Sequence, residues 1–145
     1  MRRLLPASKG AESVYLDADI VLALIKKSDW LRTYISVAKI KKPVTISLTI
    51  VEAELVTERE MGRKDSIEIA DKVHKLKIRV EPLTDKIIVK SNELRKKYEN
   101  LNIFDSVHAA ACLMLKENII STDHVFDQIE GIKRIDPREP LFPFN

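Results

Sequence analysis

Residues 14–24 read Val-Tyr-Leu-Asp-Ala-Asp-Ile-Val-Leu-Ala-Leu, which is a short β-prone run, an acidic pair and then an apolar helical run. The first three residues fit a buried strand, and Asp19 is suited to cap a helix that begins at Ile20. Farther along the chain, short apolar runs again alternate with longer helical ones. This alternation predicts an α/β fold in which helices flank a parallel sheet.

The same patterns extend the prediction to the whole chain. One domain is expected at residues 14–137, between an N-terminal extension at 1–13 and a C-terminal tail at 138–145. After the first strand and helix, further strands are expected at 44–46, 77–80, 118–121 and 133–135. Further helices are expected from Ser28 or Asp29 to about 38, and at 48–63, 66–76, 84–98, 104–117 and 125–129, with Ile50, Val51, Leu55 and Val56 on the apolar side of the helix at 48–63.

The composition is that of a single globular domain. The chain has 145 residues, of which 45% are hydrophobic and 32% charged, and this excludes a disordered chain. Its one cysteine, Cys112, excludes an intramolecular disulfide and a multi-cysteine zinc site. No apolar run approaches the ~20 residues of a membrane span, and the N-terminus lacks the apolar stretch of a signal peptide. We therefore expect a cytoplasmic protein with no membrane partner.

The net charge of +3 does not by itself identify a nucleic-acid-binding protein. Basic residues gather at 39–42, 63–64 and 95–97. Such groups are either solvated helix ends or parts of a path for phosphates, and the sequence leaves both interpretations open.

Four carboxylates fall near equivalent positions of the predicted sheet. Asp17 and Asp123 directly follow strands, Asp105 begins the helix at 104–117, and Glu52 lies one turn into the helix after the second strand. In parallel sheets, ligands bind outside the carboxyl ends of the strands. Each residue alone could cap a helix or face water, but four together need a cation, and an all-oxygen ligand set selects Mg²⁺ or Mn²⁺.

Several neighbouring side chains are secondary candidates for this site. Glu54 competes with Glu52, because the two lie about 200° apart on a helix and only one can face the site. Asp19 is a second acidic residue beside Asp17, Thr122 can donate a hydrogen bond, and Asp127 follows Asp123 by one turn.

Two further side chains of the helix at 104–117 have competing interpretations. His108 shares a helical face with Asp105, so it is either a general base or a hydrogen-bonded core residue. Cys112 lies in an alanine-rich helix and is expected in the core.

Four segments of the sequence resemble the PIN-domain family. They are Val14–Leu24 with the first aspartate, Thr49–Glu52 with a Thr three residues before the acidic ligand, Ile103–Ala111, and Ile119–Asp127, followed by a characteristic run at 132–137. The resemblance covers roughly residues 14–137 in the family's order. The Thr49 spacing favours Glu52 over Glu54 as the second ligand.

The resemblance implies a Rossmann-like, three-layer fold with about four or five parallel strands. It also implies Mg²⁺- or Mn²⁺-dependent phosphodiester cleavage, with Asp17, Glu52, Asp105 and Asp123 as metal ligands and catalytic residues. Many small members are toxins of the VapC type, which are often dimeric, pair with an antitoxin protein and cut structured RNA. We therefore expect an endoribonuclease, with RNA as substrate, an antitoxin as partner and a homodimer as its assembly.

The sequence leaves alternative functions open. An RNA-processing or quality-control nuclease would use the same residues as a toxin, and a catalytically silent binding module would keep the fold alone. The family often has Asn or Ser where this chain has Asp19, which adds a charge. A dehalogenase-like interpretation of Asp17-Ala18-Asp19 is weaker, because the segment lacks the expected Gly/Thr turn and a later catalytic Lys.

Overall fold

The computed structural model describes residues 13–26 and 29–139. Residues 1–12 of the predicted extension, the candidate cap Ser28 and residues 140–145 of the predicted tail lie outside the described residues. Within the described ranges, no helix has both the length and the apolar character needed to span a membrane.

The centre of the fold is a five-stranded sheet in which every recorded strand pair is parallel. The strand order is β3-β2-β1-β4-β5, so the chain moves outward from β1 in one direction and then crosses back to the other side of β1. This reversal between β1 and β4 is the topological switch point at which parallel α/β sheets bind ligands. The strands are β1 Val14–Leu16, β2 Pro43–Ile46, β3 Arg79–Glu81, β4 Ile119–Ile120 and β5 Arg134–Ile135.

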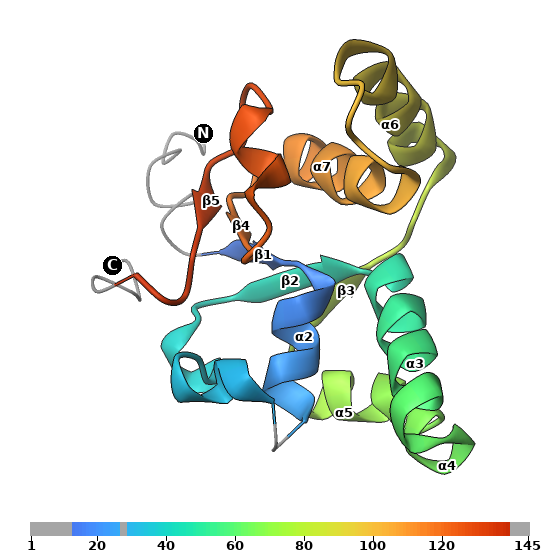
Figure 1. Ribbon diagram of the computed structural model, residues 1–145, viewed down its shortest axis with the longest axis vertical. Helices are drawn as coiled ribbons and strands as arrows, with labels where there is room; N and C mark the ends of the chain where they lie inside the picture. Colours follow the sequence, from blue (N-terminus) through green and yellow to red (C-terminus); the bar gives the residue numbers. More distant parts are fainter. Residues whose placement is uncertain (1–12, 27–28, 140–145) are drawn as a thin grey trace, which may run out of the picture.

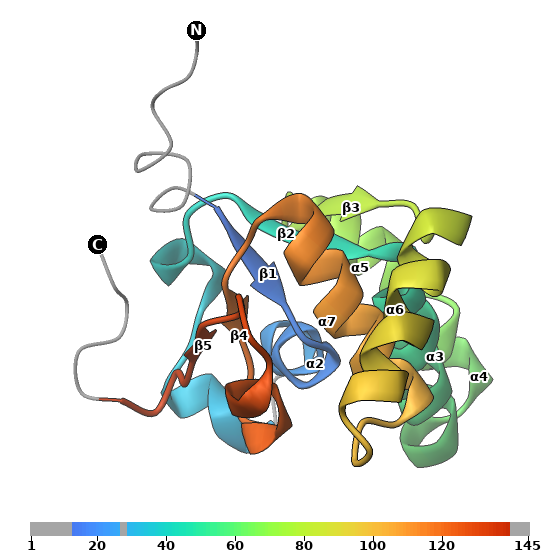
Figure 2. The same cartoon turned by 90° about the horizontal axis from the view of Figure 1, so that it is seen from above.

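Helices cover both faces of this sheet and complete the predicted three layers. In Figure 1, α6 and α7 lie above the sheet, whereas α2, α3 and α5 lie below it, and Figure 2 shows α7 alongside β1, with α6 beside α7. The α-helices are α2 Ala18–Ile25, α3 Ser47–Met61, α4 Arg63–Ser66, α5 Ile69–Lys75, α6 Asp85–Lys97 and α7 Ile103–Leu115. The 3₁₀ helices are η1 Trp30–Thr33, η2 Val37–Lys39 and η3 His124–Gln128.

Side chains that alternate along the strands divide the core into two clusters, one on each face. Tyr15 packs with α6 and α7, whereas its neighbour Leu16 packs with α2 and α5. Three consecutive alanines of α7, Ala109 to Ala111, are fully buried and let the helix approach the sheet closely. Cys112 follows them in the core, as predicted.

One predicted helix start is wrong, and one predicted helix has a different form. Asp17, not Asp19, caps α2, because its Oδ1 atom accepts a hydrogen bond from the Ala18 amide. Asp19 lies inside the helix. The single helix predicted from Ser28 or Asp29 is instead the two short 3₁₀ helices, the first capped by Asp29 through the Leu31 amide.

The predicted apolar side of α3 is wrong in part: Ile50 packs against the core and Val56 is half-buried, but the other two predicted residues are exposed. Its buried residues are Thr49, Ala53 and Thr57, whereas Val51 is 57% exposed and Leu55 is 50% exposed. The small and hydroxylated residues face inward because the Thr45 hydroxyl lies 2.7 Å from that of Thr49. This contact fixes the rotation of the helix against β2.

The helix predicted from Ser66 starts later and is interrupted. Ser66 ends α4, and Ile67, expected on the apolar side, is 70% exposed. α5 begins at Ile69 and buries Ile69 and Val73 as expected.

Candidate active site

Asp17 is held firmly at the switch point between β1 and β4. Its Oδ1 atom accepts from the Ala18 amide at 2.8 Å, and its Oδ2 atom accepts from the Ser121 hydroxyl at 2.7 Å. The side chain is almost completely buried. Two donors therefore fix a negative charge at the carboxyl end of β1.

Glu52 reaches the same site from α3. Its Oε1 atom lies 2.5 Å from the Nε2 atom of His108, and that nitrogen also lies 3.9 Å from Asp17 Oδ1. The Glu54 side chain has no such contact recorded, although its backbone carbonyl accepts from the Ser66 hydroxyl. Of the two competing glutamates, it is Glu52 that the structure brings to the strand ends.

Asp105, in the first turn of α7, faces the other three carboxylates. Burial, together with the charges of Asp123, Asp17 and Glu52 and against the lowering effect of His108, raises its pKa to about 6. This mutual repulsion shows that the four predicted residues are close enough to interact.

Asp123 is the most exposed of the four and also has a structural role. Its Oδ1 atom accepts from the Val125 amide and so caps η3. Its own amide donates to the Ser121 hydroxyl at 3.0 Å. Ser121 therefore joins Asp17 and Asp123, although it was not predicted. Its place at the end of β4, two residues before Asp123, is the sequence signal that marks it.

Asp19 lies directly behind this cluster. Its Oδ2 atom accepts from the backbone amide and the hydroxyl of Thr122, at 3.2 and 2.6 Å. Its Oδ1 atom is buried without a hydrogen-bond partner. Burial, together with the charge of Asp17, raises the pKa of Asp19 to about 6. The two secondary candidates Asp19 and Thr122 thus bind each other beside the cluster.

Asp127 points away from the cluster and pairs with the guanidinium group of Arg134. Its carboxylate pairs with Arg134, at 2.9 Å from Nε and 3.2 Å from Nη2, and lies 3.1 Å from His124 Nδ1. Hydrogen bonding to Arg134 lowers the pKa of Asp127. An arginine, Arg134 of β5, therefore lies near the strand ends. It neutralises Asp127 and Asp136, and its Nη1 atom also donates to the Ser121 carbonyl.

His108 is a buried residue with both ring nitrogens engaged. It is 1% exposed, with Glu52 at Nε2 and the Tyr15 hydroxyl 2.6 Å from Nδ1. Burial lowers its pKa, but the bond to Glu52 and the charges of Asp17, Glu52 and Asp105 raise it more, so the pKa lies above the ordinary value. The contacts match the predicted alternative of a hydrogen-bonded core residue, since no ring nitrogen is free to accept a proton from water.

The chemistry of this donor set fits a hard divalent cation. It consists of carboxylate oxygens, it includes the unpartnered buried Oδ1 atom of Asp19, and its charges repel one another. Across residues 13–26 and 29–139, however, no three His, Cys, Asp or Glu side chains already converge tightly enough to enclose an ion. The fit is therefore one of residue type and charge.

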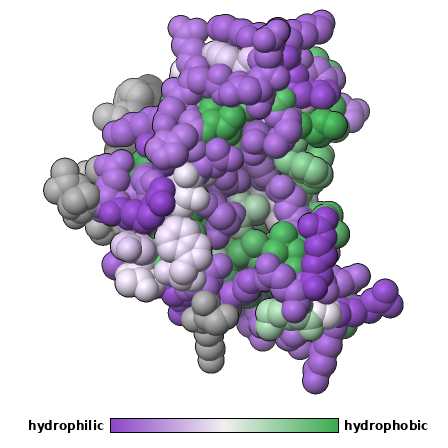
Figure 3. Space-filling view, in the orientation of Figure 1, coloured by the Kyte–Doolittle hydropathy of each residue, from purple (hydrophilic) through white to green (hydrophobic). Residues whose placement is uncertain are grey.

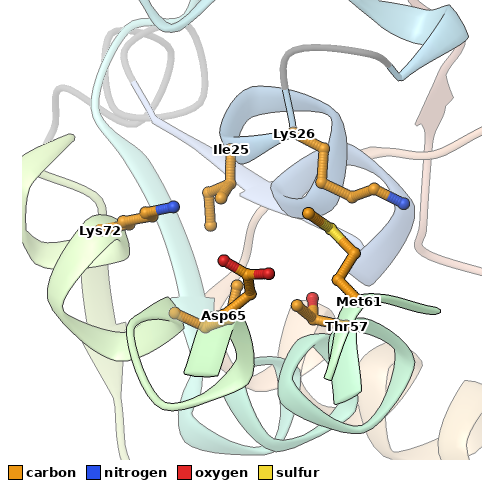
Figure 4. A pocket seen from close by; sticks show the side chains of 7 residues that line it. Ile25, Lys26, Thr57, Met61, Asp65 and Lys72 are labelled. Carbon is orange, nitrogen blue, oxygen red and sulfur yellow. The ribbon is translucent and has the colours of Figure 1, made fainter. Parts of the chain in front are cut away.

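A cavity of about 300 Å³ lies elsewhere, between the C-terminal end of α2 and the helices α3 to α5. Figure 4 shows Asp65, Thr57 and Met61 around it, with Lys26 and Lys72 at its sides. None of the four acidic candidates lines it. The acidic cluster and this cavity are separate features.

The comparisons with known proteins agree with the fold. The model of the PIN domain matches residues 14–132. Among curated proteins, no sequence matches the chain.

Several solved structures share the fold at low sequence identity. VapC20 from Mycobacterium tuberculosis, described as a toxin that cleaves the sarcin-ricin loop, is 16% identical, with a TM-score of 0.67 over 79% of this chain and 92% of that one. DNA-bound VapBC from Salmonella typhimurium is 12% identical, with a TM-score of 0.68 and coverages of 87% and 98%. VapBC-1 from nontypeable Haemophilus influenzae is 16% identical, with a TM-score of 0.67 and coverages of 88% and 99%.

The matched segment begins at the first residue of β1 and includes all four carboxylates at the ends of the parallel strands. Both helical layers fall within it as well. The chain belongs to the PIN-domain family.

Proposed function

We propose that this protein is a Mg²⁺- or Mn²⁺-dependent endoribonuclease and the toxin of a VapBC-type toxin–antitoxin pair. The observation that carries the proposal is the gathering of carboxylates at the switch point of the sheet. Ser121 joins Asp17 to Asp123, His108 Nε2 lies between Asp17 and Glu52, and the charges of all three carboxylates raise the pKa of Asp105. Such a concentration of negative charge is costly unless a cation neutralises it.

Asp17, Glu52, Asp105 and Asp123 would hold the ion, with Asp19 behind them. When bound, the ion supplies a Lewis acid that stabilises charge on a phosphate and makes a water molecule more acidic. The chain's own contribution is to orient the ligands. Ser121 and the Ala18 amide fix both oxygens of Asp17, so this carboxylate cannot rotate freely.

The remaining residues around the cluster keep it acidic and rigid. The Thr122 hydroxyl orients one oxygen of Asp19. Arg134 pairs with Asp127 and Asp136, so its positive charge neutralises these two residues and not the four carboxylates of the cluster. The carboxylates of the cluster would repel the negatively charged backbone of RNA, so RNA would bind there only when a cation is bound as well.

The substrate and partners belong to the same proposal. Structural neighbours are described as VapC or VapBC proteins, one of them as a toxin that cleaves the sarcin-ricin loop, and this supports structured RNA as substrate and an antitoxin as partner. The cytoplasm is the proposed location. Ile88 and Val89 on α6 are 41% and 58% exposed, which supports a homodimer through this helix. On the face shown in Figure 3, apolar patches lie separated by hydrophilic side chains.

The decisive test is cleavage of labelled structured RNA by the purified protein with Mn²⁺, with and without a chelator. Chelator-sensitive cleavage that Asp105→Asn abolishes, in a protein with an unchanged circular dichroism spectrum, would support the nuclease. Full metal-dependent activity in Asp105→Asn would show that the site is wrong. Absence of cleavage on every RNA tried would favour the binding module.

A toxin and an RNA-processing nuclease are separated by a second experiment. Expression of the chain alone should arrest growth, and co-expression with a small neighbouring reading frame should restore it. Growth that is unaffected by an active nuclease would favour the processing or quality-control function.

A further inference from the structure

The Glu52 carboxylate stands at the end of a buried chain of hydrogen bonds. The Tyr15 hydroxyl lies 2.6 Å from His108 Nδ1, and His108 Nε2 lies 2.5 Å from Glu52 Oε1. The two rings meet edge to face, with centroids 5.8 Å apart and an interplanar angle of 61°. Tyr15 and His108 are 0% and 1% exposed, so water does not compete for these contacts.

The chemistry of the groups sets the direction of these bonds. An ionised carboxylate can only accept hydrogen bonds, so His108 must carry a hydrogen on Nε2 and donate a hydrogen bond from it to Glu52. In the neutral imidazole, Nδ1 is then the acceptor, and the phenol of Tyr15 donates to it. Tyr15 therefore selects the tautomer of His108 that binds Glu52.

This chain is anchored in the sheet. Tyr15 belongs to β1, and its side chain lies near Thr49, the buried residue of α3 one turn before Glu52. Thr49 lies 2.7 Å from the Thr45 hydroxyl of β2, which also lies 2.9 Å from the Leu16 carbonyl. Every member is fixed by neighbours in regular structure.

Glu52 needs such support more than the aspartates do. Asp17 and Asp123 are short side chains whose oxygens accept from backbone amides beside them. Glu52 carries a longer side chain with more rotamer freedom, and it projects from a helix whose adjacent residue Val51 is exposed. Among the described residues, the recorded hydrogen-bond partner of its carboxylate is His108.

We propose that Tyr15 and His108 are positioning residues that hold the Glu52 carboxylate toward Asp17 and Asp105. His108 acts through its Nε2–H group, and Tyr15 acts through His108. Neither residue touches the substrate. The catalytic part of this inference rests on the proposed nuclease function, whereas the geometric part does not.

The test compares Tyr15→Phe, His108→Leu and His108→Gln with the control Thr57→Val. Thr57 is a buried residue of α3, the helix that carries Glu52, and it lines the separate cavity of Figure 4. Its hydroxyl makes no hydrogen bond to the described residues, so its removal breaks none. We expect His108→Leu to weaken Mn²⁺ binding about tenfold in calorimetry, with Tyr15→Phe intermediate and Thr57→Val unchanged. Glutamine should restore most of the affinity, because its amide can donate to Glu52 as Nε2–H does.

Two readouts separate positioning from simple destabilisation. The rate constant kcat should fall in His108→Leu and Tyr15→Phe while the KM for RNA stays within about twofold, because ligand orientation and not RNA binding is lost. The imidazole ¹⁵N spectrum of the metal-free protein should show His108 protonated at Nε2 in the wild type. Its resonances should shift in Glu52→Gln and Tyr15→Phe but not in Thr57→Val.

The inference is overturned if His108→Leu binds Mn²⁺ as the wild type does, or if Thr57→Val causes an equal loss. A wild-type His108 that is protonated only at Nδ1 would also overturn it. If the wild-type protein cut no RNA, the proposed function would fail, yet the Mn²⁺ affinities and the imidazole spectrum would still decide this inference.

Discussion

The hydroxyl of Ser121 donates a 2.7 Å hydrogen bond to Oδ2 of Asp17 and thereby joins the ends of two adjacent parallel strands. The Ser121 hydroxyl oxygen also accepts a hydrogen bond from the amide of Asp123 at 3.0 Å. One small side chain thus orients one acidic residue and the backbone of another. The dependence of both residues on Ser121 leads to the first prediction.

Ser121→Ala should weaken Mn²⁺ binding and reduce cleavage by about 10- to 100-fold, because it removes a donor that orients a metal ligand. The free energy of unfolding should fall by about 1–2 kcal/mol, since a buried carboxylate loses a hydrogen bond. Calorimetry and urea unfolding measure the two effects. Ser91→Ala on α6, which also removes a buried hydroxyl, is the matched control and should leave Mn²⁺ affinity unchanged.

Glu52→Gln and Glu54→Gln test which glutamate serves the site. We expect Glu52→Gln to lower kcat/KM by about 100-fold or more, because a neutral amide is a poor ligand for a hard divalent ion. Glu54→Gln should stay within about twofold of the wild type, because it is Glu52 whose carboxylate contacts His108 at the site. The two substitutions make the same chemical change, so a difference between them reports position alone. Equal losses in both variants, measured on the same RNA, would contradict the assignment.

Asp19→Asn should stabilise the metal-free protein at pH 8 while weakening Mn²⁺ binding. Burial and Asp17 raise the pKa of Asp19 to about 6, so its charged form is disfavoured in the folded state. An acid whose folded pKa is raised makes the protein more stable as the pH falls through that value. Between pH 8 and pH 5 the wild type should therefore gain stability, and the variant should show less of that gain. Thermal unfolding with excess chelator across this range is the measurement, and a variant less stable than the wild type at pH 8 would refute the prediction.

Asp136 should have the opposite dependence on pH. Hydrogen bonds from Arg138, together with those from Arg134, hold the pKa of this buried carboxyl well below its ordinary value. A depressed folded pKa contributes stability that is complete above about pH 5 and is lost as the pH falls toward the folded value. Asp136→Asn should therefore be less stable at pH 7 by about 1–3 kcal/mol and should depend less on pH between 5 and 2. Acid titrations followed by circular dichroism test this expectation.

The strands and the acidic positions were predictable because they depend on local signals. The buried runs at 14–16, 44–46 and 119–120 are apolar and short, and the residues that follow them are polar. The helix predicted at 104–117 also formed, as α7, because alanines and the Asn102 cap favour it locally. Parallel pairing then brought these strand ends together without further information.

The failures came from choices that distant contacts decide. The inward face of α3 is set by Thr45 and Thr49, and a pattern of apolar residues cannot reveal a hydrogen bond between two threonines. Asp19 is a residue type that commonly caps helices, but Asp17 caps α2. The Asp19 carboxylate instead binds Thr122, which is far along the chain. The partnership of Tyr15 with His108 likewise spans 93 positions.

The placement of β4 beside β1 has a consequence for synthesis. Ser121 and Asp17 contact each other across 104 positions, so the acidic centre requires both an early and a late segment of the chain. A growing chain that has emerged only as far as α6 holds β1, β2 and β3 but neither Asp105 nor Asp123. Such a chain lacks two of the four carboxylates, so the acidic cluster can assemble only after β4 and Asp123 have been synthesised.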